Sequence, residues 1–327
     1  MLAIRIASFG PPDVMKLEEV EPLEARDNHV LIRLHAAGVN PVDDYIRSGT
    51  YAMKPDLPYT PGMDGAGVIE AIGAGVNRPD LRPGQRVWLC RAVTGTYAQQ
   101  ALAEPIRIAP LPDRLTFEQG AAVGVAYLTA YTALVHKARI QPGEVVLIHG
   151  ASGGVGTAAV QIARAAGAIV VGTAGTEQGL ELVRQQGAHI ALDHTTSDYL
   201  DALRGMTGGR GPDVIIEMLA NKNLQRDLEC LAPRGRITIV GSRGPLEINP
   251  RAFMAKDATV TGMALFNSTQ QEWTQSLFAV NEGLRNGTLT PVVGEVMDLK
   301  DAAAAHRKVM EPGSRGKIVL VAPAARR

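Results

Sequence analysis

From Val145 onward, short apolar runs alternate with helical segments at a spacing of about 25 residues. Nearly continuous apolar runs are typical of parallel strands that are buried on both faces of a sheet. Strand–helix alternation of this kind predicts a doubly wound α/β domain with a six-stranded parallel sheet. The expected strands are Val145–His149, Ile169–Thr173, His189–Leu192, Val214–Glu217, Arg236–Val240 and Thr259–Met263.

The first third of the chain lacks a helical period. Short strands between Gly and Pro turns predict a compact β-rich unit there. The expected strands are Ala3–Ser8, Val30–Ala36, Gly65–Ile72, Arg86–Cys90 and Ala98–Ala103. The residues after Phe266 carry no nucleotide motif, so we assign them back to the β-rich unit. We therefore expect a first domain over 1–123, an α/β domain over 124–265 and a return segment over 266–327.

One helix is expected between the two patterns. Thr116 and Gln119 have the spacing of a capping box, and the apolar residues after them predict a single helix through Val135. Its apolar part is too short to span a bilayer, which takes about 20 residues.

The composition excludes several classes of protein. The 327 residues contain 33 Lys and Arg against 33 Asp and Glu, so the formal net charge is zero. A neutral chain is not drawn to nucleic-acid phosphates or anionic lipid, and we expect neither as a partner. The only cysteines, Cys90 and Cys230, are too few for a disulfide framework and fit a reducing cytoplasm. Arg5 interrupts the apolar start, so no signal peptide is expected.

The glycine-rich segment Gly150–Gly156 follows an expected strand and precedes an expected helix, which is the context of a dinucleotide-binding fingerprint. Gly153 and Gly156 occupy the second and third fingerprint positions, and Ala151 replaces the first glycine. Small residues are needed because the cofactor's pyrophosphate contacts backbone N–H groups at the helix N-terminus. The segment therefore predicts a dinucleotide site.

The end of the next strand indicates which dinucleotide is bound. NAD-binding sites place an Asp or Glu there for the ribose hydroxyls, whereas Gly172–Thr176 contains no carboxylate. Because nothing there repels a 2′-phosphate, NADPH is favoured over NADH. No Arg or Lys follows at once, so Thr176 and the more distant His194 are the candidates to hold that phosphate. His194 is equally well explained as an ordinary loop histidine.

Several blocks at preserved spacing identify a family. They are Ala37–Asp43, Ile46–Tyr51, Pro61–Gly67, His149–Gly156, Gly172–Glu177, Ile216–Asn221 and Val240–Gly244. With these blocks the chain resembles the medium-chain dehydrogenase/reductase superfamily and, within it, the zeta-crystallin family of NADPH:quinone oxidoreductases, over nearly its whole length. The resemblance implies a GroES-like catalytic domain and a Rossmann domain, with NADPH bound between them.

The resemblance also separates this chain from the zinc-dependent members of the superfamily. Those members have a Cys where this chain has Asn40, a His-Glu pair at Met63-Asp64 and another Cys at Val125. Asn, Met and Val side chains do not provide the thiolate and imidazole ligands of such a zinc ion. The four-cysteine structural lobe is absent after Cys90 as well. We therefore expect no zinc.

Without a Lewis acid, hydride transfer to an ordinary carbonyl loses its main electrostatic support. A quinone needs less help because it spreads the gained charge over a conjugated ring. We therefore expect an NADPH-dependent, zinc-independent quinone oxidoreductase, and the resemblance adds one-electron reduction to a semiquinone. Two alternatives stay open: an NADPH-dependent reductase of α,β-unsaturated aldehydes or ketones, and a non-catalytic protein that binds NADPH or RNA.

The resemblance places Asn40, Tyr45, Tyr51 and Thr129 around the nicotinamide and the substrate. Asn40 can donate an amide hydrogen bond, and the phenols can donate to a quinone oxygen or line the pocket. Tyr45 is read as a positioning residue or proton donor, with simple packing as its alternative. Thr129 is read as a cofactor contact, with a back-bonded hydroxyl in an apolar helix as its alternative.

The remaining cofactor residues also come from the resemblance. Tyr45 and Thr129 are expected to contact the cofactor together with Ser152, Gly153, Gly154, Val155, Gly175, Thr176, His194, Asn223, Val240, Gly241, Ser242, Arg243, Phe266, Asn267 and Ser268. Arg243 pairs either with a phosphate or with a surface carboxylate. Glu217 lies at the end of an expected buried strand. Its carboxylate is read either as a base or as a capped or paired structural group. The superfamily further implies a homodimer or homotetramer, paired through the strand Thr259–Met263.

Overall fold

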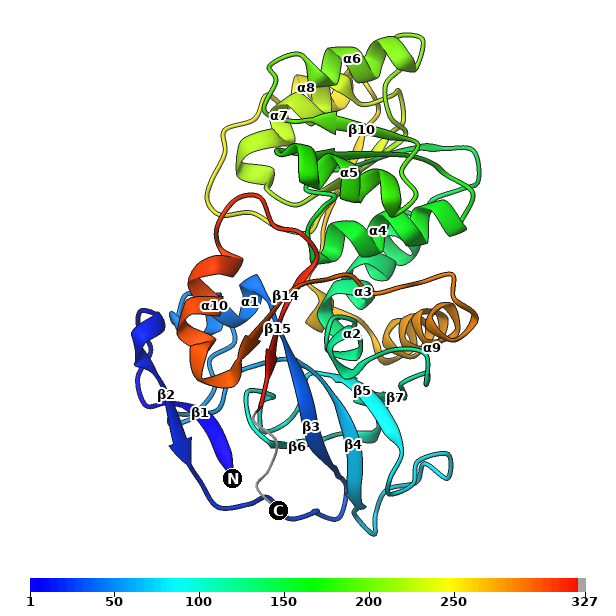
Figure 1. Ribbon diagram of the computed structural model, residues 1–327. Helices are drawn as coiled ribbons and strands as arrows, with labels where there is room; N and C mark the ends of the chain where they lie inside the picture. The colour runs from blue at the N-terminus through cyan, green and yellow to red at the C-terminus, as the bar shows by residue number, and fades with distance from the viewer. Residues whose placement is uncertain (323–327) are drawn as a thin grey trace. The chain divides into compact units, whose positions relative to one another are not determined.

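The computed structural model describes residues 1–322 (Figure 1). The chain divides into two compact units: unit 1 combines Met1–Val125 with the residues from Thr290 onward, and unit 2 is Ala126–Leu289. In this division the chain leaves unit 1 after Val125 and returns to it at Thr290. Within residues 1–322, no helix is long and apolar enough to cross a membrane.

Unit 1 is built on a seven-stranded sheet in the order β14-β15-β3-β4-β5-β7, and β6 pairs with β3. Its strands are β3 (Val30–Val39), β4 (Asp64–Ile72), β5 (Arg86–Cys90), β6 (Gln100–Ala103), β7 (Ile108–Pro110), β14 (Val293–Asp298) and β15 (Lys317–Val321). β15 pairs antiparallel with β3, so the returning segment completes the sheet. A separate antiparallel pair joins β1 (Leu2–Ile6) to β2 (Met15–Glu19).

Three short helices belong to this β-rich unit: α1 (Pro41–Arg47), α2 (Phe117–Ala121) and α10 (Ala302–Val309). The 3-10 turns are η1 (Pro12–Val14), η2 (Pro105–Arg107) and η5 (Leu299–Asp301). Ala302 and Ala305 of α10 pack in one buried cluster with Val39 of β3 and Leu320 of β15. Segments from the two ends of the chain therefore share a core.

Unit 2 contains the predicted parallel sheet, in the order β10-β9-β8-β11-β12-β13. Its strands are β8 (Val145–Ile148), β9 (Ile169–Ala174), β10 (Ile190–Asp193), β11 (Val214–Glu217), β12 (Arg236–Ile239) and β13 (Thr259–Gly262). The connecting helices are α4 (Gly154–Ala165), α5 (Glu177–Gln185), α6 (Tyr199–Met206), α7 (Ala220–Cys230) and α8 (Arg251–Met254). One core cluster buries Leu147 and Ile215 of the sheet with Leu203 of α6 and Leu228 of α7. The expected α/β fold is confirmed.

The prediction of one continuous helix over 116–135 is wrong. The structure has α2, then α3 (Gly124–Tyr131), then the π-helical turn η3 (Thr132–Lys137). The capping box of Thr116 and Gln119 is confirmed, and it starts α2. The break follows from a distant residue: the backbone N–H of Val125 donates to Asp64 Oδ1 at 2.7 Å, which supplies a new helix start.

The return to unit 1 begins at Thr290, later than the expected residue 266. The helix α9 (Gln270–Asn286), after the 3-10 turn η4 (Leu265–Asn267), belongs to unit 2. It is held to η3 by Lys137 Nζ, which donates to Glu272 Oε1 at 2.9 Å, and by a 3.1 Å contact between His136 Nε2 and Ser276 Oγ. Such contacts between residues more than 130 positions apart leave no local sequence signal.

The core of unit 2 can be tested on one helix. Leu203 and Met206 both lie on α6, where Leu203 is fully buried and Met206 is 57% exposed. Leu203→Ala is expected to lower the free energy of unfolding by about 2–5 kcal/mol because it leaves a cavity in the core. Met206→Ala should change it by about 0.5 kcal/mol or less. Urea denaturation of both variants measures the difference, and equal effects would contradict the described packing.

Candidate active site

The predicted cofactor residues gather at one edge of the unit 2 sheet. Because all six strands run parallel, their carboxyl ends meet at the same edge. Every strand is followed there by predicted residues, which are Ser152–Val155 after β8, Gly175 and Thr176 after β9, His194 after β10, Asn223 after β11, 240–243 after β12 and 266–268 after β13. The strand order reverses between β8 and β11, and ligands of open α/β sheets bind at such a switch point.

The loop between β8 and α4 fits a pyrophosphate. Gly153 is the N-cap of α4 and has no side chain that could cap the helix. The first N–H groups of α4 are therefore available to an anion such as a pyrophosphate. Gly150 adopts a positive φ of 57°. A Cβ on Gly156 would lie 2.2 Å from the carbonyl oxygen of Gly150, so only glycine permits this close approach. The loop is held to β9 because the N–H of Ala151 donates to the carbonyl of Thr173 at 2.7 Å.

The residues expected at the adenosine end of the cofactor lie close together. Thr176 is the N-cap of α5, and its hydroxyl accepts from the N–H of Gly179 at 3.1 Å. His194 Nδ1 lies 3.3 Å from Thr173 Oγ1, and a Cβ on Gly175 would lie 2.8 Å from His194 Nε2. Burial, followed by the charge of His149, lowers the pKa of His194. Its ring is therefore neutral at pH 7 and can offer a hydrogen bond rather than a full charge.

The residues expected to contact the cofactor after β11 and β12 are held by local turns. Asn223 Nδ2 donates to Glu217 Oε1 at 3.1 Å, and Ser242 Oγ donates to the carbonyl of Gly244 at 3.0 Å. The N–H of Arg243 donates to Asn221 Oδ1 at 2.9 Å. Ser268 Oγ is buried and has no hydrogen-bond partner among residues 1–322, so it can serve a ligand.

Asn40, Tyr45 and Tyr51 belong to unit 1, whereas Thr129 belongs to α3 in unit 2. The phenols of Tyr45 and Tyr51 are half-buried, and neither has a hydrogen-bond partner among residues 1–322. Thr129 is buried at 6% exposure, and within the same residues its hydroxyl makes no hydrogen bond to the preceding turn. The back-bonded alternative for Thr129 is therefore not observed, and all three hydroxyls are available to a ligand.

Asn40 lies in a buried polar cluster that the sequence did not predict. As the N-cap of α1 it donates from Nδ2 to Asp64 Oδ2 at 3.0 Å and to Asp43 Oδ2 at 3.3 Å. Its Oδ1 accepts from Lys317 Nζ, which also pairs with Asp64 Oδ2 at 2.8 Å. Both ends of the amide are thus engaged, so Asn40 can donate to a substrate only by giving up one of these bonds.

The cluster continues through the interior of unit 1. Tyr97 OH donates to Asp43 Oδ2 at 3.4 Å and lies 3.2 Å from His306 Nε2. Burial raises the pKa of Asp43 to about 6, and it raises the pKa of Tyr97 as well. Lys317 and His306 come from the returning segment, more than 200 positions from their partners. Spacing along the chain could not have identified them.

The positions that hold zinc in related enzymes do not fit a zinc ion here. Asn40 and Val125 offer no thiolate, and Met63 replaces an imidazole. The one carboxylate, Asp64, is fully buried and already accepts from Val125, Asn40 and Lys317. A lysine ammonium beside this carboxylate supplies the positive charge that a metal ion would bring.

A separate cavity of about 840 Å³ lies in unit 1. Its lining includes Asp43, Tyr59, Met63 and Arg91. None of Asn40, Tyr45 and Tyr51 lines it, so we assign it no part in the predicted site.

Comparison with known proteins identifies the class. Residues 26–113 match the alcohol dehydrogenase GroES-like domain, and residues 154–282 match the zinc-binding dehydrogenase family. The chain is 51% identical over 323 residues to a quinone oxidoreductase of Sus scrofa and 49% identical to that of Homo sapiens, with 98% of both chains covered in each case. The structure of Escherichia coli quinone oxidoreductase complexed with NADPH matches with a TM-score of 0.88 at 30% identity, covering 98% of this chain and 100% of that chain.

A GroES-like unit joined to a parallel dinucleotide-binding unit defines the medium-chain dehydrogenase/reductase superfamily. Within that superfamily the chain belongs to the quinone oxidoreductase family of zeta-crystallin. Both steps of the resemblance seen in the sequence are therefore confirmed.

The glycine loop offers a test of the cofactor site. Gly156→Ala is expected to weaken NADPH binding at least about tenfold, because the added Cβ pushes against Gly150 and Ala151 in the loop. Gly205→Ala is the matched control, since a Cβ there meets nothing within 4 Å. Fluorescence titration with NADPH measures both affinities, and an unchanged dissociation constant for Gly156→Ala would rule out this loop as the binding site.

The buried cation of unit 1 can be tested in the same way. Lys317→Met leaves Asp64 buried without its ammonium and is expected to cost about 3–5 kcal/mol of unfolding free energy. Lys308→Met is the control, because its ion pair with Glu295 is exposed and worth about 1 kcal/mol or less. Denaturant titration of the two variants compares them, and a loss for Lys317→Met as small as for Lys308→Met would refute the buried pair.

Proposed function

We propose that this chain is an NADPH-dependent quinone oxidoreductase that works without zinc. The observation that carries the proposal is the 51% identity over 98% of both chains to a quinone oxidoreductase. The residues at the carboxyl ends of all six strands of unit 2 support it, because they include the fingerprint loop and the turns expected around a dinucleotide.

Unit 2 is proposed to bind the cofactor. The uncapped N-terminus of α4 binds the pyrophosphate, and the turn after β9 faces the adenosine. No carboxylate occupies that turn, since β9 ends at Ala174 and Gly175 and Thr176 follow. The site therefore accepts a 2′-phosphate, with Thr176 and the neutral ring of His194 as hydrogen-bonding groups beside it. On this basis NADPH is preferred to NADH.

The substrate is proposed to meet hydrogen-bond donors rather than a metal ion. When bound, NADPH supplies the reducing equivalents. Tyr45 positions the quinone or donates a proton to its oxygen, and Tyr51 offers a second phenol. Asn40 is held rigidly by Lys317, Asp43 and Asp64, so it shapes the site and keeps the cation of Lys317 in place. Thr129 offers its unpaired hydroxyl to the cofactor.

The zinc-independent chemistry follows from the donor set. Asp64 is the one carboxylate among the positions that hold zinc in related enzymes, and Lys317 is already paired with it. A quinone tolerates this because the electrons it gains are delocalised over its ring. An α,β-unsaturated ketone gains a similarly delocalised charge, so it remains the second candidate substrate. The one-electron course stays a prediction.

Other proposals concern the state of the protein in the cell. We expect a homodimer or homotetramer joined through β13, since β13 is an edge strand of the unit 2 sheet. Cys90 and Cys230 are both buried and unpaired, which agrees with a cytoplasmic location. We expect no RNA partner. Sedimentation that finds only monomers would reject the expected assembly.

The function is tested by NADPH oxidation in the presence of different acceptors. The purified protein is expected to oxidise NADPH faster with 9,10-phenanthrenequinone or 1,2-naphthoquinone than without them, and faster with NADPH than with NADH. Enone acceptors are expected to be poorer, and faster enone turnover would favour the second candidate. Activity that a chelator removes and zinc restores would contradict the zinc-independent site. No acceleration by any quinone would reject the proposed function.

A further inference from the structure

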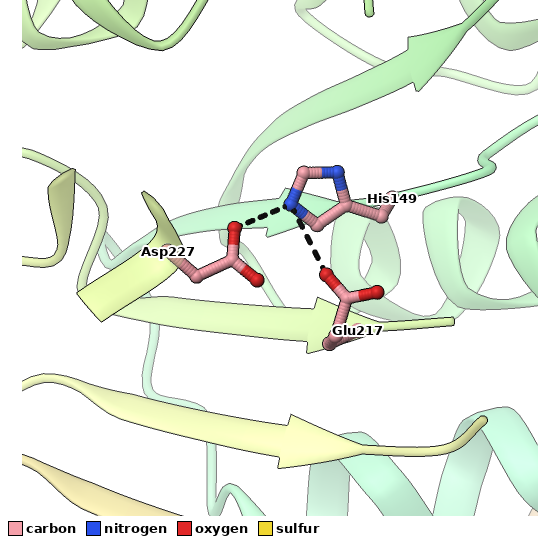
Figure 2. Close-up of side chains that lie close together, drawn as sticks. All are labelled: His149, Glu217 and Asp227. Atoms are coloured by element: carbon pink, nitrogen blue, oxygen red, sulfur yellow. Dashed lines mark hydrogen bonds and ion pairs between the residues drawn. The ribbon is translucent and has the colours of Figure 1, made fainter. Parts of the chain in front are cut away.

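Three titratable side chains meet in the interior of unit 2, outside the residues already assigned to the cofactor (Figure 2). His149 follows β8, Glu217 ends β11 and Asp227 lies on α7. His149 Nε2 lies 2.8 Å from Asp227 Oδ1 and 3.4 Å from Glu217 Oε2. Glu217 and Asp227 are fully buried, and His149 is 3% exposed. We call these three residues the switch-point cluster, because β8 and β11 flank the reversal of strand order.

The cluster has too few hydrogens for its oxygens. Glu217 Oε2 and Asp227 Oδ2 are buried, and neither has a hydrogen-bond partner among the described residues. Two buried carboxylates that each leave an oxygen without a donor are strongly destabilising. Oxygens of the two carboxyl groups lie within 4.8 Å of each other. One proton shared between Glu217 and Asp227 would remove the problem, because a carboxylic acid can donate to a carboxylate.

The surroundings favour the bound proton. Burial raises the pKa of Glu217 to about 8 and that of Asp227 to about 7. Burial also lowers the pKa of His149, so the imidazole does not supply the missing charge. The other titratable or charged groups facing the cluster are Arg226 and Cys230 from α7, Tyr199 from α6 and His194 after β10. Arg226 is the one permanent cation among them, and it opposes protonation of both His149 and Asp227.

The cluster is bonded to the turns that are proposed to hold the cofactor. His149 immediately precedes the glycine loop, and its N–H donates to the carbonyl of Ile216 at 3.1 Å. Glu217 Oε1 accepts from the N–H of Leu219 and from Asn223 Nδ2. The carbonyl of Glu217 accepts from the N–H groups of Val240 and Gly241, at 2.8 and 3.3 Å. Movement of the Glu217 side chain would thus disturb the turn after β11, and the backbone of the same residue anchors the turn after β12.

We propose that His149, Glu217 and Asp227 are positioning residues for NADPH, and that a proton shared between Glu217 and Asp227 holds the turns at the switch point in their binding geometry. Loss of this proton places two like charges side by side in the interior and displaces the turns that Glu217 supports. It also adds one negative charge below the site of a polyanionic cofactor. This inference rests on the proposed binding of NADPH to unit 2.

The direction of the pH effect follows from the raised pKa values. The folded protein binds more protons than the unfolded chain between the ordinary carboxyl range, near pH 4, and about pH 8. The stabilising contribution is therefore complete below about pH 4 and is lost as the pH rises through 7 to 8. NADPH binding is expected to weaken as the pH rises through the pKa of Glu217, about 8, and beyond it.

The experiment measures the dissociation constant of NADPH for the full-length protein from pH 7 to pH 9. For the wild type the dissociation constant at pH 9 is expected to be up to about tenfold higher than at pH 7, because pH 9 lies one unit above the pKa of about 8. Glu217→Gln replaces the shared proton by an amide hydrogen that cannot dissociate, so the ratio of the constants at pH 9 and pH 7 should approach one. Asp227→Asn should do the same and serves if Glu217→Gln does not fold.

The matched control is Glu229→Gln on the same helix, an exposed carboxylate bonded only to Gln225 within residues 1–322. It should keep the wild-type ratio. A wild-type ratio below about two, or the same ratio in Glu217→Gln, would overturn the proposal. NADPH binding that is absent at every pH would instead reject the proposed function.

The cluster has the composition of a metal site, so metal analysis of the purified protein is included. A stoichiometric ion that is lost in His149→Gln would overturn the proposal, because a cation would then take the place of the proton.

Discussion

The parallel pairing of β8 with β9 and β11 is the constraint on which the proposed chemistry depends. It brings the carboxyl ends of six strands to one edge and reverses the strand order between β8 and β11. Side chains and N–H groups at that edge lie in the turns and helix starts that follow the strands. A chain with few charged groups in its core can therefore build a dinucleotide site from glycines, helix ends and a handful of polar residues.

The two units bury charge in different ways. In unit 1 the carboxylate of Asp64 is paired with the ammonium of Lys317, and opposite charges compensate each other. In unit 2 Glu217 and Asp227 would carry like charges if both were ionised, and Arg226 is the permanent cation that acts on Asp227. The arrangement in unit 2 depends on a dissociable proton shared between the two carboxyl groups.

Patterns that depend on local chemistry were predicted well. The strands Arg86–Cys90 and Val214–Glu217 have the expected bounds, and the other five parallel strands differ from the expected ones by one residue at one or both ends. The single helix expected after Thr116 was wrong, because Asp64 of β4 accepts from the N–H of Val125 and a second helix, α3, starts there. The return to unit 1 falls at Thr290 and not at 266, because side chains of η3 hold α9 in unit 2. Each error traces to a contact between distant residues.

The sequence by itself determined the class of fold, the glycine loop, the absence of a carboxylate after β9 and the family. These features are carried by residues that lie close together along the chain, so spacing reveals them. The tertiary structure decided that both ends of the Asn40 amide are occupied, that Lys317 stands beside Asp64, and that His149, Glu217 and Asp227 form one cluster. Those facts depend on how distant segments pack and on how burial removes water from charged groups, which no local pattern records.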